Sequence, residues 1–523
     1  MRLLAILALW CSSLAWAAVI PPTPLEKAHF LVLPDSRDTG RYLAELDDRL
    51  EQARLVSLGN SAGGRSIDAL LVSSSPAFLR SYRPEPDKAT VLVLAAQHGN
   101  EPAGAEAVLQ LARELAAGEH ADLLKRLNLV LVALANPDGR DLSRRHNANN
   151  DNTNIDYVAL NAGETRLLVN ALHSFDPDLV YDAHESGIWK RVLTKQQGWL
   201  TDVEVQFEVG NNPNIDARLL DYGEHFLLPA LLRRVSGAGV RAEAYRGEVT
   251  RLGQLVARGG LGITNLRNYA ALQGRVSVLV ESRLDNKAGR YATPRNIAER
   301  VRKQHLALLS LLQLAAEDSA RLVSVSRQAR HGWRSRAGDG RTLWMDVQFG
   351  LNADRPEVWL PLVRLVDGRR EWHPFANHNT ILTGEPVALP PAYAVTRERE
   401  RMARWLSRHH IRFDTVRAPR MLAAERLQIE TVLPQPASRP GVREKWRAEV
   451  ASRPAVVRLG PGDLLVPTEQ PLGPLAALML DPRSSNSLYQ EADWRWLAPG
   501  RFPVFPVWPS EPGAAGAAPD RRD

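Results

Sequence analysis

Short apolar, β-branched runs alternate with helix-like segments along the first 317 residues, and this alternation restricts the fold more than any other feature. The expected strands are 91–96, 129–134, 178–183 and 275–282, preceded by a hairpin at 55–73. The expected helices are about 39–54, 102–117, 163–175 and 295–317. Strands that follow one another through helices pair in parallel and are covered on both faces. The sequence therefore predicts the α/β class, with a mostly parallel mixed sheet sandwiched by helices.

The chain changes character after Asp318, where short strand-like pieces and prolines replace the alternating pattern. Nine of its thirteen Trp follow residue 330, and residues 396–410 have a helix-like composition. Such Trp residues could line a polymer-binding face or pack in the core and in hairpins, and packing is the preferred interpretation. We expect a main domain at 26–318, a smaller β-rich α+β accessory domain at 319–508 and a disordered tail at 509–523.

The first seventeen residues, MRLLAILALWCSSLAWA, have a basic start, an apolar run and a small-residue end. This pattern is typical of a secretory signal, here cleaved after Ala17. A membrane anchor is the alternative, but the run is short and contains Ser12 and Ser13. The only cysteine, Cys11, lies inside it, so the mature chain relies on its core rather than on disulfides. We predict an exported protein, periplasmic or secreted.

The remaining composition argues against two classes of partner. The formal net charge is +7 over 523 residues, and the basic residues are scattered, with no nucleic-acid-binding motif. No segment after the signal is long and apolar enough to cross a bilayer. We therefore expect no nucleic acid partner and no membrane span. The sequence does not indicate an oligomeric state.

His98 and Glu101 stand three residues apart just after the strand expected at 91–96. On a loop that leaves a strand, this spacing lets an imidazole and a carboxylate face one point. A Glu beside Pro102 is also a favourable helix start, so the pair alone does not establish a metal site. His184 follows another expected strand, and parallel sheets collect functional groups at the carboxyl ends of their strands. Two His, one Glu and an open position are typical of catalytic zinc.

Glu281 ends the apolar segment VSVLVE, an unusual place for a carboxylate in a core strand. It suits a general base that activates a metal-polarised water, although a strand-end charge is the simpler explanation. His184 has a simpler explanation too, as a turn residue whose neighbours Asp182 and Glu185 are merely solvated. The case for a site therefore depends on the four residues occurring together.

Together these residues resemble the carboxypeptidase A-like family of zinc peptidases, and the resemblance covers residues 40–315. That family has His-x-x-Glu, then an Arg and an Asn-Arg pair, then a His and finally a Glu late in the domain. The stretch NPDGRD at 136–141 is similar to the family's Asn-Pro-Asp-Gly turn, and GNSAGGRSI at 59–67 is similar to its early hairpin.

The resemblance implies a role for each matching residue. Its zinc ligands are matched by His98, Glu101 and His184, which implies one Zn²⁺ per chain. In RHNANNDNTNIDY, residues 145–157, Arg145 matches the Arg that stabilises the oxyanion. Asn154 matches an Asn that binds the terminal carboxylate of the substrate. Glu281 matches the carboxylate that activates the water polarised by zinc.

The chain departs from the family where the terminal carboxylate is bound. Ile155 stands in place of the carboxylate-binding Arg. Arg258 and Arg267, before the strand that ends at Glu281, could supply the missing charge. Asn150 and Asn152 also replace the usual Gly and Asp.

Two assignments have a rival nearby in the sequence. Arg144 is adjacent to Arg145 and competes for the oxyanion role. Tyr269 is taken as the Tyr that caps the substrate, and Tyr245 is the alternative. Neither Tyr aligns with the family motif securely enough to decide between them.

We therefore expect a zinc-dependent peptidase of the metallocarboxypeptidase type, which hydrolyses an amide bond of a peptide or muropeptide in the periplasm. A zinc-dependent N-acyl amino acid deacylase or other amidase is a second hypothesis, kept open by Ile155. A non-catalytic periplasmic peptide- or glycan-binding protein is a third hypothesis. The intact set of chemistry-bearing residues argues against this third hypothesis.

Overall fold

The computed structural model of the protein describes residues 20–284, 296–332, 341–435, 445–494 and 496–509. The predicted signal peptide, 1–17, lies outside these residues, as does all of the predicted tail except residue 509. Among the described residues, no helix combines the length and the apolar character needed to span a bilayer.

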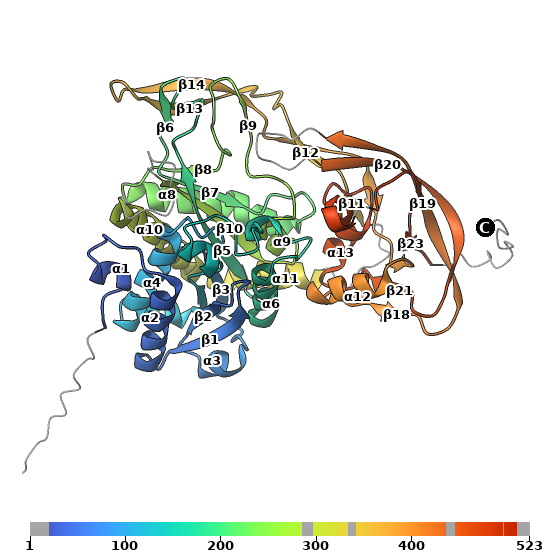
Figure 1. Ribbon diagram of the computed structural model, residues 1–523, viewed down its shortest axis with the longest axis horizontal. Helices are drawn as coiled ribbons and strands as arrows, with labels where there is room; N and C mark the ends of the chain where they lie inside the picture. The colour runs from blue at the N-terminus through green and yellow to red at the C-terminus, as the bar shows by residue number, and fades with distance from the viewer. Residues whose placement is uncertain (1–19, 285–295, 333–340, 436–444, 495, 510–523) are drawn as a thin grey trace, which may run out of the picture.

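A mixed sheet of eight described strands forms the centre of the N-terminal part (Figure 1). In spatial order the strands are β1 (Ala53–Asn60), β2 (Ser66–Val72), β4 (Leu127–Val132), β3 (Ala89–Ala95), β5 (Leu179–Gly187), β10 (Val276–Leu284), β7 (Val205–Val209) and β8 (Ala242–Ala244). The four in the middle, from β4 to β10, run parallel, and β1, β2 and β7 pair antiparallel to a neighbour. The predicted fold class is confirmed.

Helices cover both faces of this sheet, which is why its central strands consist mainly of apolar residues. One face carries α2 (Ser36–Arg49), α4 (Ala103–Ala116), α8 (Leu228–Gly237) and α10 (Ile297–Glu317). The other carries α6 (Gly163–Phe175) and α9 (Leu266–Ala271). Every residue of β3 and β4 is buried between the two layers. The helix expected at 39–54 is α2, which ends earlier because residues from Ala53 onward pair with β2.

The C-terminal part consists mainly of antiparallel strands. Its largest described sheet contains β18 (Asp414–Thr415), β21 (Leu464–Pro467), β17 (Ala392–Val395), β23 (Val504–Val507), β19 (Arg420–Gln435) and β20 (Lys445–Leu459), with β22 (Gly500–Arg501) beside β19. The expected helix at 396–410 is α12 (Arg399–Arg408). The tryptophans divide into buried ones, such as Trp405 and Trp494, and exposed ones, such as Trp359 and Trp372. Packing in the core therefore accounts for the first group, and the exposed pair belongs to the antiparallel hairpin of residues 357–377.

The N-terminal and C-terminal parts share elements across the boundary expected at 318/319. One sheet combines β6 (Trp199–Thr201) and β9 (Leu255–Val256) with β13 (Glu357–Arg364) and β14 (Arg370–Asn377), at the top of Figure 1. Helix α11 (Ser319–Gly332) contacts β3. A single apolar cluster also contains buried residues of both parts, among them Leu172 of α6 and Met402 of α12. The two-domain division stays a prediction. Because the two parts share a core, a truncation at the expected boundary tests it.

Truncation after Asp318 is expected to leave a fragment that aggregates. Removing the C-terminal part exposes apolar surface of the shared cluster, and each large apolar side chain that loses its cover costs ~1.5–3 kcal/mol. Size-exclusion chromatography and thermal unfolding of residues 18–318, beside residues 18–523, measure this effect. A monomeric fragment that melts within a few degrees of the longer chain would instead establish an independent N-terminal domain.

Candidate metal centre

His98, Glu101 and His184 converge where β3 and β5 approach their carboxyl ends. Their ligand atoms all lie within 4.8 Å of one another, and all three side chains are buried. Glu101 Oε1 is 3.0 Å from His98 Nδ1, and Glu101 Oε2 is 2.9 Å from His184 Nδ1. The two Nδ1 atoms are 3.1 Å apart. The structure thus brings together the three residues that the sequence singled out as metal ligands.

Polar groups behind each imidazole determine which nitrogen faces the centre. Asn152 Oδ1 accepts from the backbone N–H of Asn154, so it is an acceptor that lies 3.2 Å from His98 Nε2. His184 Nε2 lies 3.0 Å from the Asp182 carboxylate, a charge contact rather than a well-aligned hydrogen bond. Both contacts favour a proton on Nε2 and leave the Nδ1 lone pairs directed at the centre. Two lone pairs that face each other beside a carboxylate are stabilised by a cation, and this donor set fits Zn²⁺.

The electrostatics of the cluster also favour a cation. Burial raises the pKa of the Glu101 carboxyl, but His98 and His184 beside it lower that pKa well below its usual range. Burial lowers the pKa of His98, which keeps this imidazole in the neutral form that binds metals. Burial also lowers the pKa of His184, but Asp182 and Glu101 outweigh it and raise that pKa well above its usual value. The negative charge of Asp182 and Glu101 that raises this pKa would also stabilise a bound cation.

The ligand loop, residues 97–101, is pressed against the turn that contains the Asn-Pro-Asp-Gly motif. A Cβ atom on Gly99 would lie 2.0 Å from the carbonyl carbon of Gly139, so only glycine fits there. Ala96, just before the loop, has a φ of 54°, a left-handed conformation that is rare for residues with a side chain. The loop thus turns sharply out of β3 and is fixed by close contact.

Asn136 connects the ligand loop to the segment that carries Arg145. Its side chain caps α5 (Pro137–Asp141) by accepting from Gly139 N at 2.9 Å. The same amide donates to the carbonyl oxygens of Gln97, at 3.2 Å, and Arg145, at 3.3 Å. This explains why an Asn-Pro-Asp-Gly turn accompanies the two ligands in the sequence.

Arg145 is the arginine that reaches the centre. Its Nη1 donates to Glu101 Oε1 at 3.0 Å, and the side chain is half-exposed, so its other donors are open to a substrate. Arg144 is exposed on the surface. The structure therefore places Arg145 rather than Arg144 where it could interact with a substrate oxygen.

Glu281 lies beside the cluster on the neighbouring strand. It pairs in register with His184 across the parallel strands β10 and β5, so the two side chains leave the sheet on the same face. Burial raises the pKa of its carboxyl to about 8, with a smaller contribution of the same sign from Glu101. The structure brings Glu281 to the same face as the three candidate ligands.

The segment around Asn154 contains two of the positions where the sequence departs from the family, Asn150 and Ile155. Asn150 has a φ of 66°, a left-handed conformation that Asn tolerates, which accounts for its replacement of the usual Gly. Asn154 Oδ1 is 3.5 Å from Gln97 Nε2, close to the ligand loop. Ile155 is 52% exposed and therefore does not supply a buried substitute for an arginine.

Arg258 and Arg267 are both occupied by other groups. Arg258 binds the carboxylates of Glu208, at 2.5 Å, and Glu224, at 2.7 Å. Arg267 is buried, and its Nη2 donates to Asn211 Oδ1 and to the Gly260 carbonyl. In the structure as it stands, neither guanidinium replaces the clamp that Ile155 lacks.

Tyr269 is a correction to the sequence analysis. Its side chain is fully buried, and its hydroxyl is 2.9 Å from His409 Nδ1 in the C-terminal part. A tyrosine held in the core in this way does not face a substrate, and we do not assign it that role. Tyr245, the alternative, is half-buried just after β8.

The acidic neighbours of His184 have roles that the sequence analysis missed. Asp182 and Glu185 are almost completely buried, not solvated. Glu185 accepts two bonds from Arg300, at 2.8 and 2.9 Å, and one from Ala103 N at 2.9 Å. It thereby locks α4 and α10 to β5 beside the ligands. The contact between Asp182 and His184 could have been predicted from the Asp-Ala-His spacing, because residues i and i+2 of a strand share a face.

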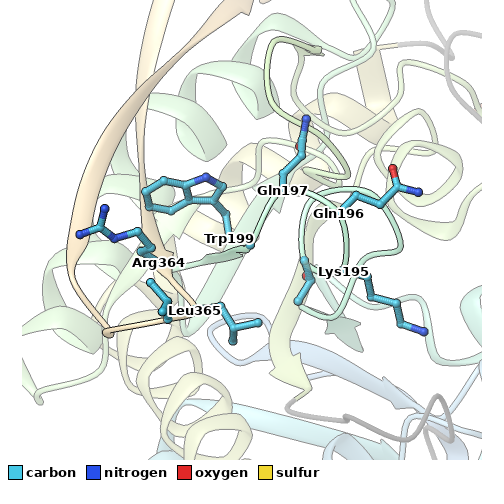
Figure 2. A pocket seen from close by; sticks show the side chains of 9 residues that line it. Lys195, Gln196, Gln197, Trp199, Arg364 and Leu365 are labelled. Atoms are coloured by element: carbon cyan, nitrogen blue, oxygen red, sulfur yellow. The ribbon is translucent and has the colours of Figure 1, made fainter.

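A separate surface pocket lies on the sheet shared by the two parts (Figure 2). It has a volume of about 420 Å³, and its lining includes Lys195, Gln197, Trp199 and Arg364. The Trp199 ring packs edge-on against His373, with ring centroids 4.3 Å apart. None of the residues of the metal centre belongs to this lining, so the pocket does not bear on the chemistry of that centre.

A mixed α/β sheet that presents two imidazoles, a carboxylate and a second acidic group at one edge defines a zinc-hydrolase class of site. Residues 40–184 match the family described as zinc carboxypeptidase. The family is one of zinc metallopeptidases, in agreement with the resemblance in the sequence.

Relatives by sequence include carboxypeptidase 2 of Trichophyton rubrum, which is 24% identical over 82% of this chain and 78% of that protein. A protein named "Probable carboxypeptidase 2" from Trichophyton verrucosum is 27% identical over 49% of each chain. The chain thus spans about half the length of the first curated relatives it matches. A similar solved structure is the metallo-carboxypeptidase from Burkholderia cenocepacia, with 18% identity, a TM-score of 0.41, and coverage of 55% of this chain and 71% of that one.

Proposed function

We propose that this chain is a zinc-dependent peptidase of the metallocarboxypeptidase type, with one zinc ion held by His98, Glu101 and His184. The observation that supports this most directly is the convergence of two Nδ1 atoms and a carboxylate on one buried point. The family match over residues 40–184, a range that includes the three residues, supports the same conclusion.

The residues around the point of convergence supply the remaining chemistry. Zinc held there would lower the pKa of a water molecule and would polarise the scissile carbonyl. Glu281 takes a proton from the attacking water as the new C–O bond forms, and delivers it to the amine nitrogen as the C–N bond breaks. Arg145 donates to the carbonyl oxygen as it gains negative charge. Each step uses a side chain on the side of the sheet where the ligands lie.

Recognition of the substrate's C-terminus is proposed to depend on Asn154 without a partner arginine. An arginine binds a carboxylate through two parallel charge-assisted hydrogen bonds, and an isoleucine offers none. The half-exposed Ile155 leaves that end of the site open. This feature also leaves room for the second hypothesis, a zinc-dependent amidase or N-acyl amino acid deacylase, because an amidase whose substrate has no carboxylate beside the scissile amide needs no clamp.

The wild-type protein is expected to hydrolyse free-acid and amidated forms of one peptide at rates that differ by less than ~10-fold, because the ~2–5 kcal/mol typical of a buried charge pair is missing. Ile155→Arg should raise the preference for the free acid, and its exposed position leaves room for the longer side chain. Ile155→Gln is the uncharged control. The test is to measure kcat/KM for both substrates with all three proteins. A strong preference of the wild type for the free acid would contradict the loss of the carboxylate clamp.

The substrate and the location of the protein are also part of the proposal. The signal-like residues 1–17 support an extracytoplasmic protein, and a peptide or muropeptide is the proposed substrate. Digestion of a mixed peptide and muropeptide library with and without zinc, followed by mass spectrometry, tests both the activity and the substrate class. Zinc-dependent retention of peptides without cleavage would instead support the third hypothesis, a binding protein.

A further inference from the structure

Two side chains of the C-terminal part contact the Val158 carbonyl oxygen, which lies in the segment that follows Asn154. Trp405 Nε1 donates to the Val158 oxygen at 2.8 Å, and His409 Nε2 lies 3.0 Å from the same oxygen. Both side chains are at most 2% exposed. Trp405 belongs to α12 and His409 follows its end, whereas Val158 lies four residues after Asn154. The C-terminal part therefore contacts the chain close to the metal centre, although it contributes none of the predicted ligands.

His409 also connects the Val158 carbonyl group to Tyr269. A carbonyl oxygen only accepts, so the proton of His409 is on Nε2. Burial lowers the pKa of His409 to about 3, which keeps the imidazole neutral. Its Nδ1 must then accept, and the Tyr269 hydroxyl, 2.9 Å away, donates to it. The Tyr269 ring in turn packs against Tyr157, with ring centroids 5.3 Å apart.

Tyr157 continues the connection to the metal centre. The Asp182 carboxylate only accepts, so the Gln97 amide must present its nitrogen to it, at 2.7 Å. The Gln97 oxygen then accepts from the Tyr157 hydroxyl at 2.8 Å. Asp182 is the carboxylate that lies 3.0 Å from His184 Nε2. Tyr157, Gln97 and Asp182 are all buried, so water does not compete for these bonds.

We propose that the C-terminal part positions the metal centre: His409 and Tyr269 hold Tyr157, which orients Gln97 and Asp182 and thereby directs Nδ1 of His184 toward the metal. This gives residues 319–508 a role beyond the proposed hydrolysis, and it relies on the proposed function only for the presence of zinc. Tyr157 and His409 are positioning residues, since neither touches the centre itself.

The physical reason is that a buried amide keeps its orientation only while both of its ends are paired. Without the Tyr157 hydroxyl, the Gln97 oxygen is left without that donor and the amide can rotate. Asp182 then loses its fixed donor and holds His184 less firmly. Loss of a direct partner of a ligand, such as Asp182, typically weakens metal binding 10–100-fold, and loss of the Tyr157 hydroxyl acts through that partner.

The test compares the zinc affinity of variants that lose one hydroxyl each. Tyr157→Phe is expected to raise the zinc dissociation constant ~10–100-fold, and Tyr269→Phe about 2–10-fold, as expected for the loss of one hydrogen bond. Tyr393→Phe is the matched control, because Tyr393 is a buried tyrosine of the C-terminal part whose hydroxyl donates to Asp481 at 3.2 Å. The dissociation constants are measured by competition with a chromogenic chelator, at a temperature where all proteins are folded.

A purely structural role would lower the melting temperatures of all three variants and leave zinc binding unchanged. Zinc dissociation constants of Tyr157→Phe and Tyr269→Phe within twofold of the wild type would overturn the proposal. An effect of Tyr157→Phe alone would overturn the connection to the C-terminal part. A wild-type protein that binds no zinc would refute the proposed function instead, so the two failures are distinguishable.

Discussion

Glu281→Gln should lower amide turnover by at least ~100-fold, and up to ~10⁴-fold, which is the usual range for the loss of a general base. The carboxamide keeps the shape of the side chain but cannot accept the proton of the attacking water. Zinc content should stay at the wild-type level, because Glu281 is not among the three converging ligands. Steady-state kinetics on one amide substrate, together with metal analysis of the same sample, measure both quantities.

Glu248→Gln provides the matched control for this variant. Glu248 is another carboxylate in the electrostatic surroundings of Glu281, and it forms an ion pair with Lys190 at 3.2 Å. Its loss changes the local charge in the same way without removing the proposed base, so turnover should change only severalfold. Near wild-type turnover in Glu281→Gln would reduce Glu281 to an ordinary strand-end charge.

His184→Ala is expected to abolish stable zinc binding. The variant loses one of two imidazole ligands and leaves Asp182 and Glu101 as unbalanced negative charges in the core. The fold should persist, because Gln304 bonds the backbone oxygen of His184, at 2.7 Å, and not its side chain. Elemental analysis after gel filtration should give close to no zinc in the variant and about one per chain in the wild type, as for a mononuclear site.

His305→Ala controls for the loss of any histidine from the N-terminal part. His305 lies on α10 and contacts Glu114 at 2.6 Å, and it is not one of the converging ligands. Its removal should leave the zinc content unchanged. Full zinc retention in His184→Ala would exclude this residue as a ligand and leave His98 and Glu101 without their proposed partner.

Local patterns in the chain were enough to predict the central elements. The segment 163–175 is α6 with the same bounds, and the strand expected at 178–183 matches the first half of β5, which continues to Gly187. These elements are predictable because burial between two layers of helices requires an apolar residue at nearly every strand position. The end of α2 was not predictable, because pairing of the following residues with β2 decides it.

The candidate ligands were predictable for a related reason. His98 and Glu101 follow the buried strand β3, and His184 lies in the second half of β5, so that parallel strands bring all three to one edge of the sheet. Tyr269 failed for the opposite reason. Its position in the sequence, before the strand of Glu281, does not indicate which way its side chain points. In the folded protein, the packing of α12 directs the Tyr269 hydroxyl to His409.

The sequence by itself determined the α/β sheet, the order of the three ligands and the missing arginine at Ile155, since each depends on residue type and spacing along the chain. Only the tertiary structure decided which arginine reaches Glu101, which nitrogen of each imidazole faces the centre and what the C-terminal part contacts. Those features depend on Glu101, Asn152 and Val158 meeting partners from distant segments of the chain. A hydrogen bond has a direction as well as a partner, and spacing along the chain does not specify that direction for residues that meet only in the folded protein.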